Sequence, residues 1–274
     1  MLRSLSSGVS GVQQFQSKLD VIGNNIANSS TYGYKSGRAD FEDSFSQSLQ
    51  ASGGSNNIQI GSGVSTGAVR SLFDVGTITR TGVPGDMAID GDGFFMVRDA
   101  VSGETFATRA GDFRRDSQGY LVTNQGYRVQ GYGDAGLTAP GDIKIDDTGK
   151  PDTDTTTIKD FRIEADGKLK VVLGSGNSFV RGQILLQRFQ DPEALVKEGN
   201  NLFSGIESAG ALAQAEAAGT NGLGSIQGGH LESSNVDLAS EFASLITTQR
   251  GFQASARIIT TSDEMLQEVV NLKR

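Results

Sequence analysis

A seven-residue hydrophobic repeat near each end of the chain restricts most strongly what this sequence can fold into. The N-terminal repeat consists of Leu5, Val12, Leu19 and Ile26, widened by Leu2, Val9, Phe15 and Ile22. Such spacing predicts a helix with a narrow apolar stripe, as in coiled coils. The helix is expected to end at residues 28–33, where Asn and Gly accept left-handed backbone geometry.

The C-terminal repeat is longer and predicts a second helix. Its members are Leu238, Leu245, Phe252, Ile259 and Leu266. The segment Ser234–Asp237, with Asp237 three residues after Ser234, is expected to cap the N-terminus of this helix. Gln249 and Asp263 belong to the companion positions of the stripe, where polar side chains can fix the register between helices. Gly251 is expected to permit close backbone approach.

Between the two ends the pattern changes to short apolar runs separated by Gly, Asp and Asn. We therefore expect an α+β protein. A discontinuous, coiled-coil-like helical domain would form from residues 1–32 and 234–274, and a central antiparallel β-rich domain, of sandwich or barrel type, from 71–203. Residues 33–70 and 204–233 contain few large apolar side chains and are expected to be extended connectors.

Composition excludes several classes of function. With 24 Lys and Arg against 32 Asp and Glu, the net charge is −8, which disfavours nucleic-acid binding. The absence of Cys and the single His exclude disulfides, thiolate zinc sites and multi-His metal sites. No apolar run reaches membrane-spanning length, so no membrane insertion is expected. The start lacks the apolar core of a signal peptide, which predicts a cytosolic protein or one exported without a cleaved signal.

Residue clusters that resemble catalytic or metal sites have simpler explanations. Asp90–Gly93 lacks the later ligands of a calcium loop and is expected to be a turn. The acidic cluster Asp146, Asp147, Asp152 and Asp154 is expected to be a solvated loop. His230 has no nucleophile motif near it. We predict no catalytic residue, no metal site and no cofactor, and therefore no enzyme.

The two apolar stripes need partners, and two solutions are open. A pair of helices with one open side is marginally stable, because ordering costs about 1–2 kcal/mol per residue. The helices can pack on the β-rich domain, or they can stay loose in the monomer and become ordered in an assembly. The expected assembly interface comprises Leu5, Val12, Leu19, Ile22, Asn25, Ile26, Leu238, Leu245, Gln249, Phe252, Ile259 and Leu266. Arg109, Arg114 and Arg115 are further candidates for pairing with acidic groups of an adjoining subunit.

Several motifs resemble those of the bacterial flagellar rod and hook proteins, in the same order over nearly the whole chain. They are Leu19–Asn28 with Thr31–Lys35, Asp86–Phe95, Thr108–Phe113 with Gly119–Val122 and Gln130–Tyr132, Gly199–Phe203, Leu231–Leu238, and Gln249–Ala254 with the ending Asn271–Arg274. Within this family, the similarity is greatest to the hook subunits, as shown by the segments Gly23–Asn25 and Gln249–Phe252 and by the ending. The resemblance is to a short hook subunit without the extra outer domain.

The resemblance implies a structural subunit that self-assembles into the tubular universal joint of the hook, with the terminal helices lining the inner tube. The alternative within the family is the distal rod, a stiff drive shaft. The connector at residues 46–66 is long, which is similar to the connector of distal rod proteins. Implied partners are further copies of the chain, the distal rod, the hook–filament junction, the hook cap and the type III export apparatus. The implied location is the flagellum, outside the cytoplasm. Two other classes stay open: a surface- or carbohydrate-binding β module whose helical ends oligomerise, and an enzyme acting on cell-wall polymers, for which no carboxylate pair stands out.

Overall fold

A computed structural model describes residues 2–44, 46–48, 59–134, 136–150, 156–211 and 215–272. The chain divides into two compact units. Unit 1 comprises residues 1–29, 36–72 and 236–274, and unit 2 comprises residues 30–35 and 73–235. Each unit is described by itself.

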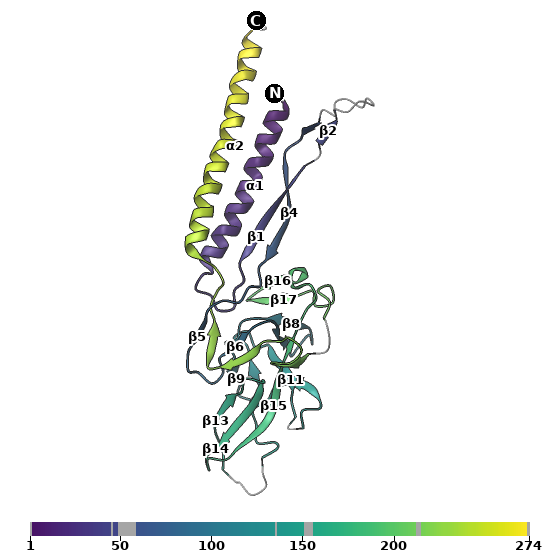
Figure 1. The fold of residues 1–274 in the computed structure, drawn as a ribbon, viewed down its shortest axis with the longest axis vertical. Helices are drawn as coiled ribbons and strands as arrows, with labels where there is room; N and C mark the ends of the chain where they lie inside the picture. Colours follow the sequence, from purple (N-terminus) through teal and green to yellow (C-terminus); the bar gives the residue numbers. More distant parts are fainter. Residues whose placement is uncertain are drawn as a thin grey trace. The chain divides into compact units, whose positions relative to one another are not determined.

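The two helices of unit 1 are α1 (Leu2–Ala27) and α2 (Leu238–Leu272). They lie side by side and antiparallel (Figure 1), with Ser4 hydrogen-bonded to Ser262 near one end and Asn25 to Glu241 near the other. α1 ends as predicted, and the Asn28 side chain donates to the Asn24 carbonyl. The cap of α2 lies in the predicted segment Ser234–Asp237: Asp237 accepts from the Ala239 N–H, because it directly precedes the first turn.

The segment expected to be an extended connector over 33–70 instead forms a β-ribbon in unit 1. β1 (Gly37–Asp43) pairs antiparallel with β4 (Val64–Ser71), and β2 (Ser46–Ser48) with β3 (Gln59–Gly61). Residues 49–58 lie outside the described residues. One face of the ribbon packs on α1, where the Phe15 and Phe41 rings meet edge to face at 6.4 Å. The polar composition that suggested a connector reflects strands with mostly exposed side chains.

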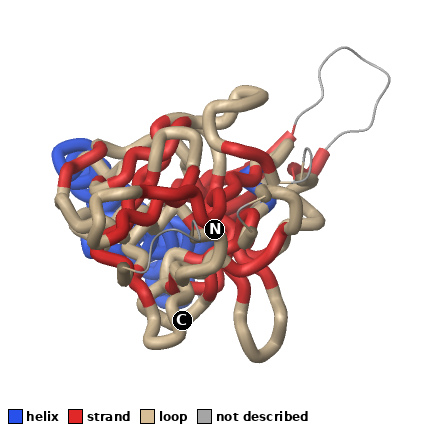
Figure 2. The backbone as a smooth tube through the Cα atoms, turned by 90° about the horizontal axis from the view of Figure 1, so that it is seen from below, coloured by secondary structure: helices blue, strands red, loops and turns tan. Residues whose placement is uncertain are grey.

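Unit 2 is built on a twelve-stranded antiparallel sheet, which confirms the predicted β-rich domain. The main strand order is β13-β14-β15-β11-β7-β8-β17-β16, with β9, β10, β12 and β18 paired to its sides. In that order the strands are Ile158–Ile163, Lys168–Leu173, Ser178–Gln187, Arg128–Tyr132, Phe94–Arg98, Thr105–Thr108, Leu202–Ser204 and Val196–Gly199; β9, β10, β12 and β18 are Arg114–Arg115, Leu121–Val122, Pro140–Asp142 and Glu216–Ala217. Strands and loops dominate unit 2 (Figure 2), with a single 3₁₀ turn at Pro192–Ala194 among its described residues.

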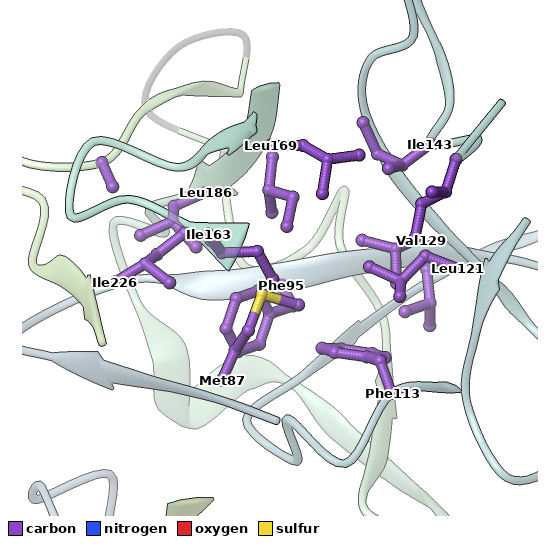
Figure 3. Close-up of a cluster of buried hydrophobic side chains, with 14 of the residues drawn as sticks. Met87, Phe95, Phe113, Leu121, Val129, Ile143, Ile163, Leu169, Leu186 and Ile226 are labelled. Atoms are coloured by element: carbon purple, nitrogen blue, oxygen red, sulfur yellow. The ribbon is translucent and has the colours of Figure 1, made fainter. Parts of the chain in front are cut away.

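The alternation of side chains along β7 places a hydrophobic core on each face of the sheet. Phe95 and Val97 join a large cluster with Met87, Leu186 and Ile226 (Figure 3). Their neighbour Phe94 joins a second cluster, in which Phe73, Phe189 and Phe203 meet it edge to face. Successive strand residues point to opposite faces, so a run of consecutive apolar residues indicates a strand covered on both sides.

The second expected connector, residues 204–233, is also structured. β19 (Ser225–Gly228) pairs with β6 (Met87–Asp90), and β20 (His230–Glu232) pairs with β5 (Ile78–Arg80). Ile226 and Leu231 are buried by this pairing. A segment with few large apolar residues therefore completes unit 2 through backbone hydrogen bonds and a few buried side chains, among them Leu223, Ile226 and Leu231. Residues 212–214, in the alanine-rich run, lie outside the described residues.

Candidate assembly surface

The seam between α1 and α2 is made largely of small residues. Thr248 and Ser262 of α2 are buried, and Gly8 and Gly11 of α1 face α2. A Cβ atom on Gly251 would stand 2.6 Å from the Phe15 ring, so this glycine makes room for an aromatic side chain of α1, where close approach of the backbones was expected. Small side chains let the helices approach closely, and larger apolar side chains, among them Phe15 and Ile259, pack against the glycines of the opposite helix.

The predicted interface residues occupy different environments within unit 1. On α1, Ile22 and Asn25 are buried. The half-buried members of the prediction flank the seam, and they are Leu5, Val12, Leu19, Ile26, Leu245, Phe252, Ile259 and Leu266. Leu238 and Gln249 are exposed. Gln249 and Asp263 therefore do not fix the register inside this pair, because the companion positions that meet α1 are Thr248, Ser255 and Ser262.

A short apolar stripe lies on an exposed side of α2, in its N-terminal part. We call it the outer stripe, and it comprises Leu238, Phe242 and Ile246, which the four-residue spacing places on one side of the helix. These side chains are between 44% and 53% exposed. Leu238 is part of the predicted heptad repeat, and the four-residue spacing could have revealed the other two in the sequence. Exposed apolar patches of this kind mark surfaces that bind another protein.

Asn25 joins three elements of unit 1. Its side-chain amide donates to the Gly37 carbonyl at 2.9 Å and to Glu241 Oε1 at 3.0 Å, and its Oδ1 accepts from the Gly37 N–H at 2.9 Å. The side chain is thus satisfied while almost fully buried. It connects α1 to both β1 and α2, which gives a structural reason for an amide at this position.

Unit 2 contains a buried ion cluster of Lys35, Arg109 and Glu232, which we call the Glu232 cluster. Lys35 Nζ lies 2.6 Å from Glu232 Oε1, and Arg109 Nη1 lies 3.5 Å from Glu232 Oε2. Lys35 also donates to the Asp74 carbonyl, and the Gly76 N–H donates to Glu232. Burial lowers the pKa of both Lys35 and Arg109, and the carboxylate opposes that shift by favouring their charged forms.

The Glu232 cluster brings together three of the sequence motifs, those at 31–35, 108–113 and 231–238. Gly33, with φ +67°, leaves no room for a side chain, because a Cβ there would stand 2.5 Å from the Ala110 nitrogen. The proposed role of Arg109 in pairing with another subunit is wrong, since its side chain is buried and bound to Glu232. Arg114 and Arg115 are exposed.

Residues of the other candidate sites form hydrogen bonds and ion pairs within unit 2. Asp146 Oδ1 lies 2.5 Å from Arg181 Nε, and His230 Nδ1 lies 2.9 Å from the Gly228 carbonyl oxygen. Asp152 and Asp154 lie outside the described residues. Within the described ranges, no group of three or more His, Cys, Asp or Glu side chains is placed to hold a metal ion. In the same ranges, neither helix combines the length and apolarity that crossing a membrane requires.

Comparison with protein-family models gives three matches along the chain. "Flagella basal body rod protein" matches residues 5–35, "Flagellar hook protein FlgE/F/G D1 domain" matches 88–171, and "Flagellar basal body rod FlgEFG protein C-terminal" matches 227–272. The first and third cover α1 and α2, and the second covers much of the sheet of unit 2.

Individual relatives align over the whole chain. The flagellar basal-body rod protein FlgG of Bacillus subtilis is 43% identical over 281 residues, covering 100% of both chains. The FlgG of Caulobacter vibrioides is 36% identical, covering 99% of this chain and 100% of its own. The flagellar hook protein FlgE of Borreliella burgdorferi is 26% identical over 444 residues, covering 100% of both chains.

Proposed function

Because the chain belongs to the family of bacterial flagellar rod and hook proteins, a family of axial structural proteins, we propose that it is a subunit of the distal rod. In this role copies of the chain polymerise into a stiff tube that transmits torque. The end-to-end match with FlgG rod proteins carries the proposal. The function is mechanical, and the chain is proposed to act without a cofactor.

The comparison with the hook protein supports the choice of rod over hook. The alignment with FlgG spans 281 residues, close to the 274 of this chain, whereas the alignment with the hook protein spans 444. Identity also falls from 43% to 26%. The hook remains the second candidate, because the sequences of residues 249–252 and of the ending Asn271–Arg274 are similar to those of hook subunits.

The outer stripe of α2 supports polymerisation as the mode of action. Its side chains lie on one helix of unit 1 and are about half exposed. Burying an apolar side chain of this size contributes about 1.5–3 kcal/mol. Contacts between different surfaces of successive copies produce open-ended polymers, as a tube requires. We further propose that the predicted heptad residues close the tube together with the outer stripe, and that the chain is exported through the type III apparatus to neighbouring axial proteins.

Electron microscopy of a strain that lacks this gene tests the proposal. Loss of a distal rod subunit should leave basal bodies with a truncated rod and no hook, and the intact gene should restore both. If the deletion strain instead retains a complete rod and lacks only the hook, the chain is a hook subunit. If rod and hook are both intact, the structural role itself is wrong.

A further inference from the structure

A cleft of about 460 Å³ lies beside β13, at the edge of the sheet of unit 2. It is lined by Val83, Pro84 and Phe161, together with Arg80 and Arg162. In the described part of the chain neither arginine has an ion-pair partner. The cleft is therefore a partly apolar hollow that presents two free cationic side chains, with Asp160 as the one carboxylate in its wall.

The turn between β7 and β8 has the complementary character. Val101 at its tip is 95% exposed, the largest exposure of the apolar side chains named for the described residues. Asp99 and Glu104 flank it, so an apolar knob stands between two carboxylates. The strand order places β14, β15 and β11 between β13, which borders the cleft, and β7, which carries the turn.

The turn is held in a fixed shape. Asp99 Oδ1 accepts from the Val101 N–H and Asp99 Oδ2 from the Ser102 hydroxyl, both at 2.9 Å, while the Gly103 N–H donates to the Asp99 carbonyl. These hydrogen bonds lower the pKa of Asp99, so its carboxylate stays ionised. A preorganised turn loses little conformational entropy when it binds, which favours association.

We infer that the turn at residues 99–104 of one copy inserts into the β13 cleft of a second copy, with Val101 against Val83, Pro84 and Phe161. Asp99 and Glu104 would then lie near Arg80 and Arg162. The charges and apolar surfaces match, and the two surfaces are different, so the contact is heterologous and repeats along a polymer. This inference rests on the proposed function and adds a contact between β-rich units to the contacts of the helices.

Engineered cysteines give a direct test, because the chain has no Cys of its own. One copy carries Val101→Cys and a second copy carries Val83→Cys, both expressed in the deletion strain, and isolated basal bodies are oxidised. A disulfide requires Cβ atoms about 3.5–4.5 Å apart. We expect a cross-linked dimer from the mixture and none from either variant alone. Val196→Cys, at a valine 56% exposed and outside the cleft, replaces Val83→Cys as the matched control and should give no dimer.

The outcomes separate this contact from the proposed function. If Val101→Cys and Val83→Cys are both present in basal bodies but no cross-linked dimer forms, the contact is wrong and the proposed function is unaffected. A dimer between Val101→Cys and Val196→Cys would also overturn the contact. Absence of the unmodified chain from basal bodies overturns the proposed function. As a second measurement, Glu104→Arg and Arg162→Glu should each weaken assembly by up to about fivefold, and the double variant should recover. Failure of the double variant to recover counts against the pairing.

Discussion

At the scale of single residues, Lys35 and Arg109 are buried beside one carboxylate, that of Glu232. Replacing Glu232 by Gln removes the ion-pair partner of two buried cations, and removal of one partner of a buried ion pair costs about 3–5 kcal/mol. We expect the free energy of unfolding of unit 2, measured in urea, to fall by that amount. Glu207→Gln, the same change at an exposed residue, should leave it unchanged. Equal effects of the two substitutions would contradict this assignment.

Asp146 provides a prediction for pH dependence. Burial raises its pKa, but hydrogen bonds from Arg181 and Thr148 outweigh that effect and hold the pKa at about 2, below the ordinary 3.8. Its stabilising contribution is therefore complete above pH 3.8 and is lost as the pH falls toward 2. Asp146→Asn should cost about 1–2 kcal/mol at neutral pH, and the difference from the unmodified chain should disappear in acid.

Unfolding curves at several pH values would check this, with Asp147→Asn, at an exposed neighbour, as the control. A loss of stability in Asp146→Asn that persists unchanged at pH 2 would show that the ion pair is not its cause.

The Glu232 cluster could not be predicted from the sequence for a physical reason. Lys and Glu are almost always exposed, and a pattern of residue types gives no signal for a pair separated by 197 positions. The motifs at 31–35 and 231–238 were recognised as segments, but the contact between Lys35 and Glu232 appears only when the chain is folded. By contrast Gly251 could be interpreted locally, because a glycine inside a helical repeat already indicates close packing.

At the scale of elements, hydrophobic spacing predicts both helices with nearly correct ends, but it does not identify every residue of α2 that meets α1. The positions that meet α1 include Thr248, Ser255 and Ser262, small polar residues that a search for apolar repeats does not mark. The same limit applies to the β1–β4 ribbon, whose strands are too polar and exposed to resemble core strands. The short strands of unit 2 were easier to predict, because buried alternating residues and glycine turns mark their limits.

The outer stripe of α2 supplies the prediction at this scale. Ile246→Asp places a charge on an exposed apolar surface, so the monomer should keep its helical content while the rod fails to assemble. Motility and the presence of the chain in isolated basal bodies are the measurements, and circular dichroism follows the monomer. Thr247→Asp is the control, because the next residue points about 100° away around the helix.

Assembly of Ile246→Asp at the normal level would exclude this part of the stripe as an interface. Assembly lost equally with Thr247→Asp would show that any added charge on α2 is harmful, and would not support a specific apolar contact.

At the scale of the whole molecule, the two units have different sources of stability. Unit 2 has a hydrophobic core on both faces of its sheet, and β19 and β20 complete it through pairing with β6 and β5. Unit 1 is a helix pair and a β-ribbon with few fully buried apolar side chains, and several large apolar side chains of α2, such as Phe242 and Ile246, are exposed. Ordering each residue costs about 1–2 kcal/mol, so unit 1 gains less to offset that cost before copies associate.

Limited digestion of the monomer with trypsin tests this difference. Cleavage is expected after Arg250 and Arg257 of α2, with a resistant fragment near residues 73–235. This fragment is longer than the predicted β-rich domain of residues 71–203, because β19 and β20 belong to unit 2. In assembled rods the same two arginines should resist cleavage, because the outer stripe is then covered. Mass spectrometry of the fragments gives the cut sites. A monomer in which Arg250 and Arg257 are already protected would mean that unit 1 is stable alone, and assembly would then join preformed helices instead of ordering them.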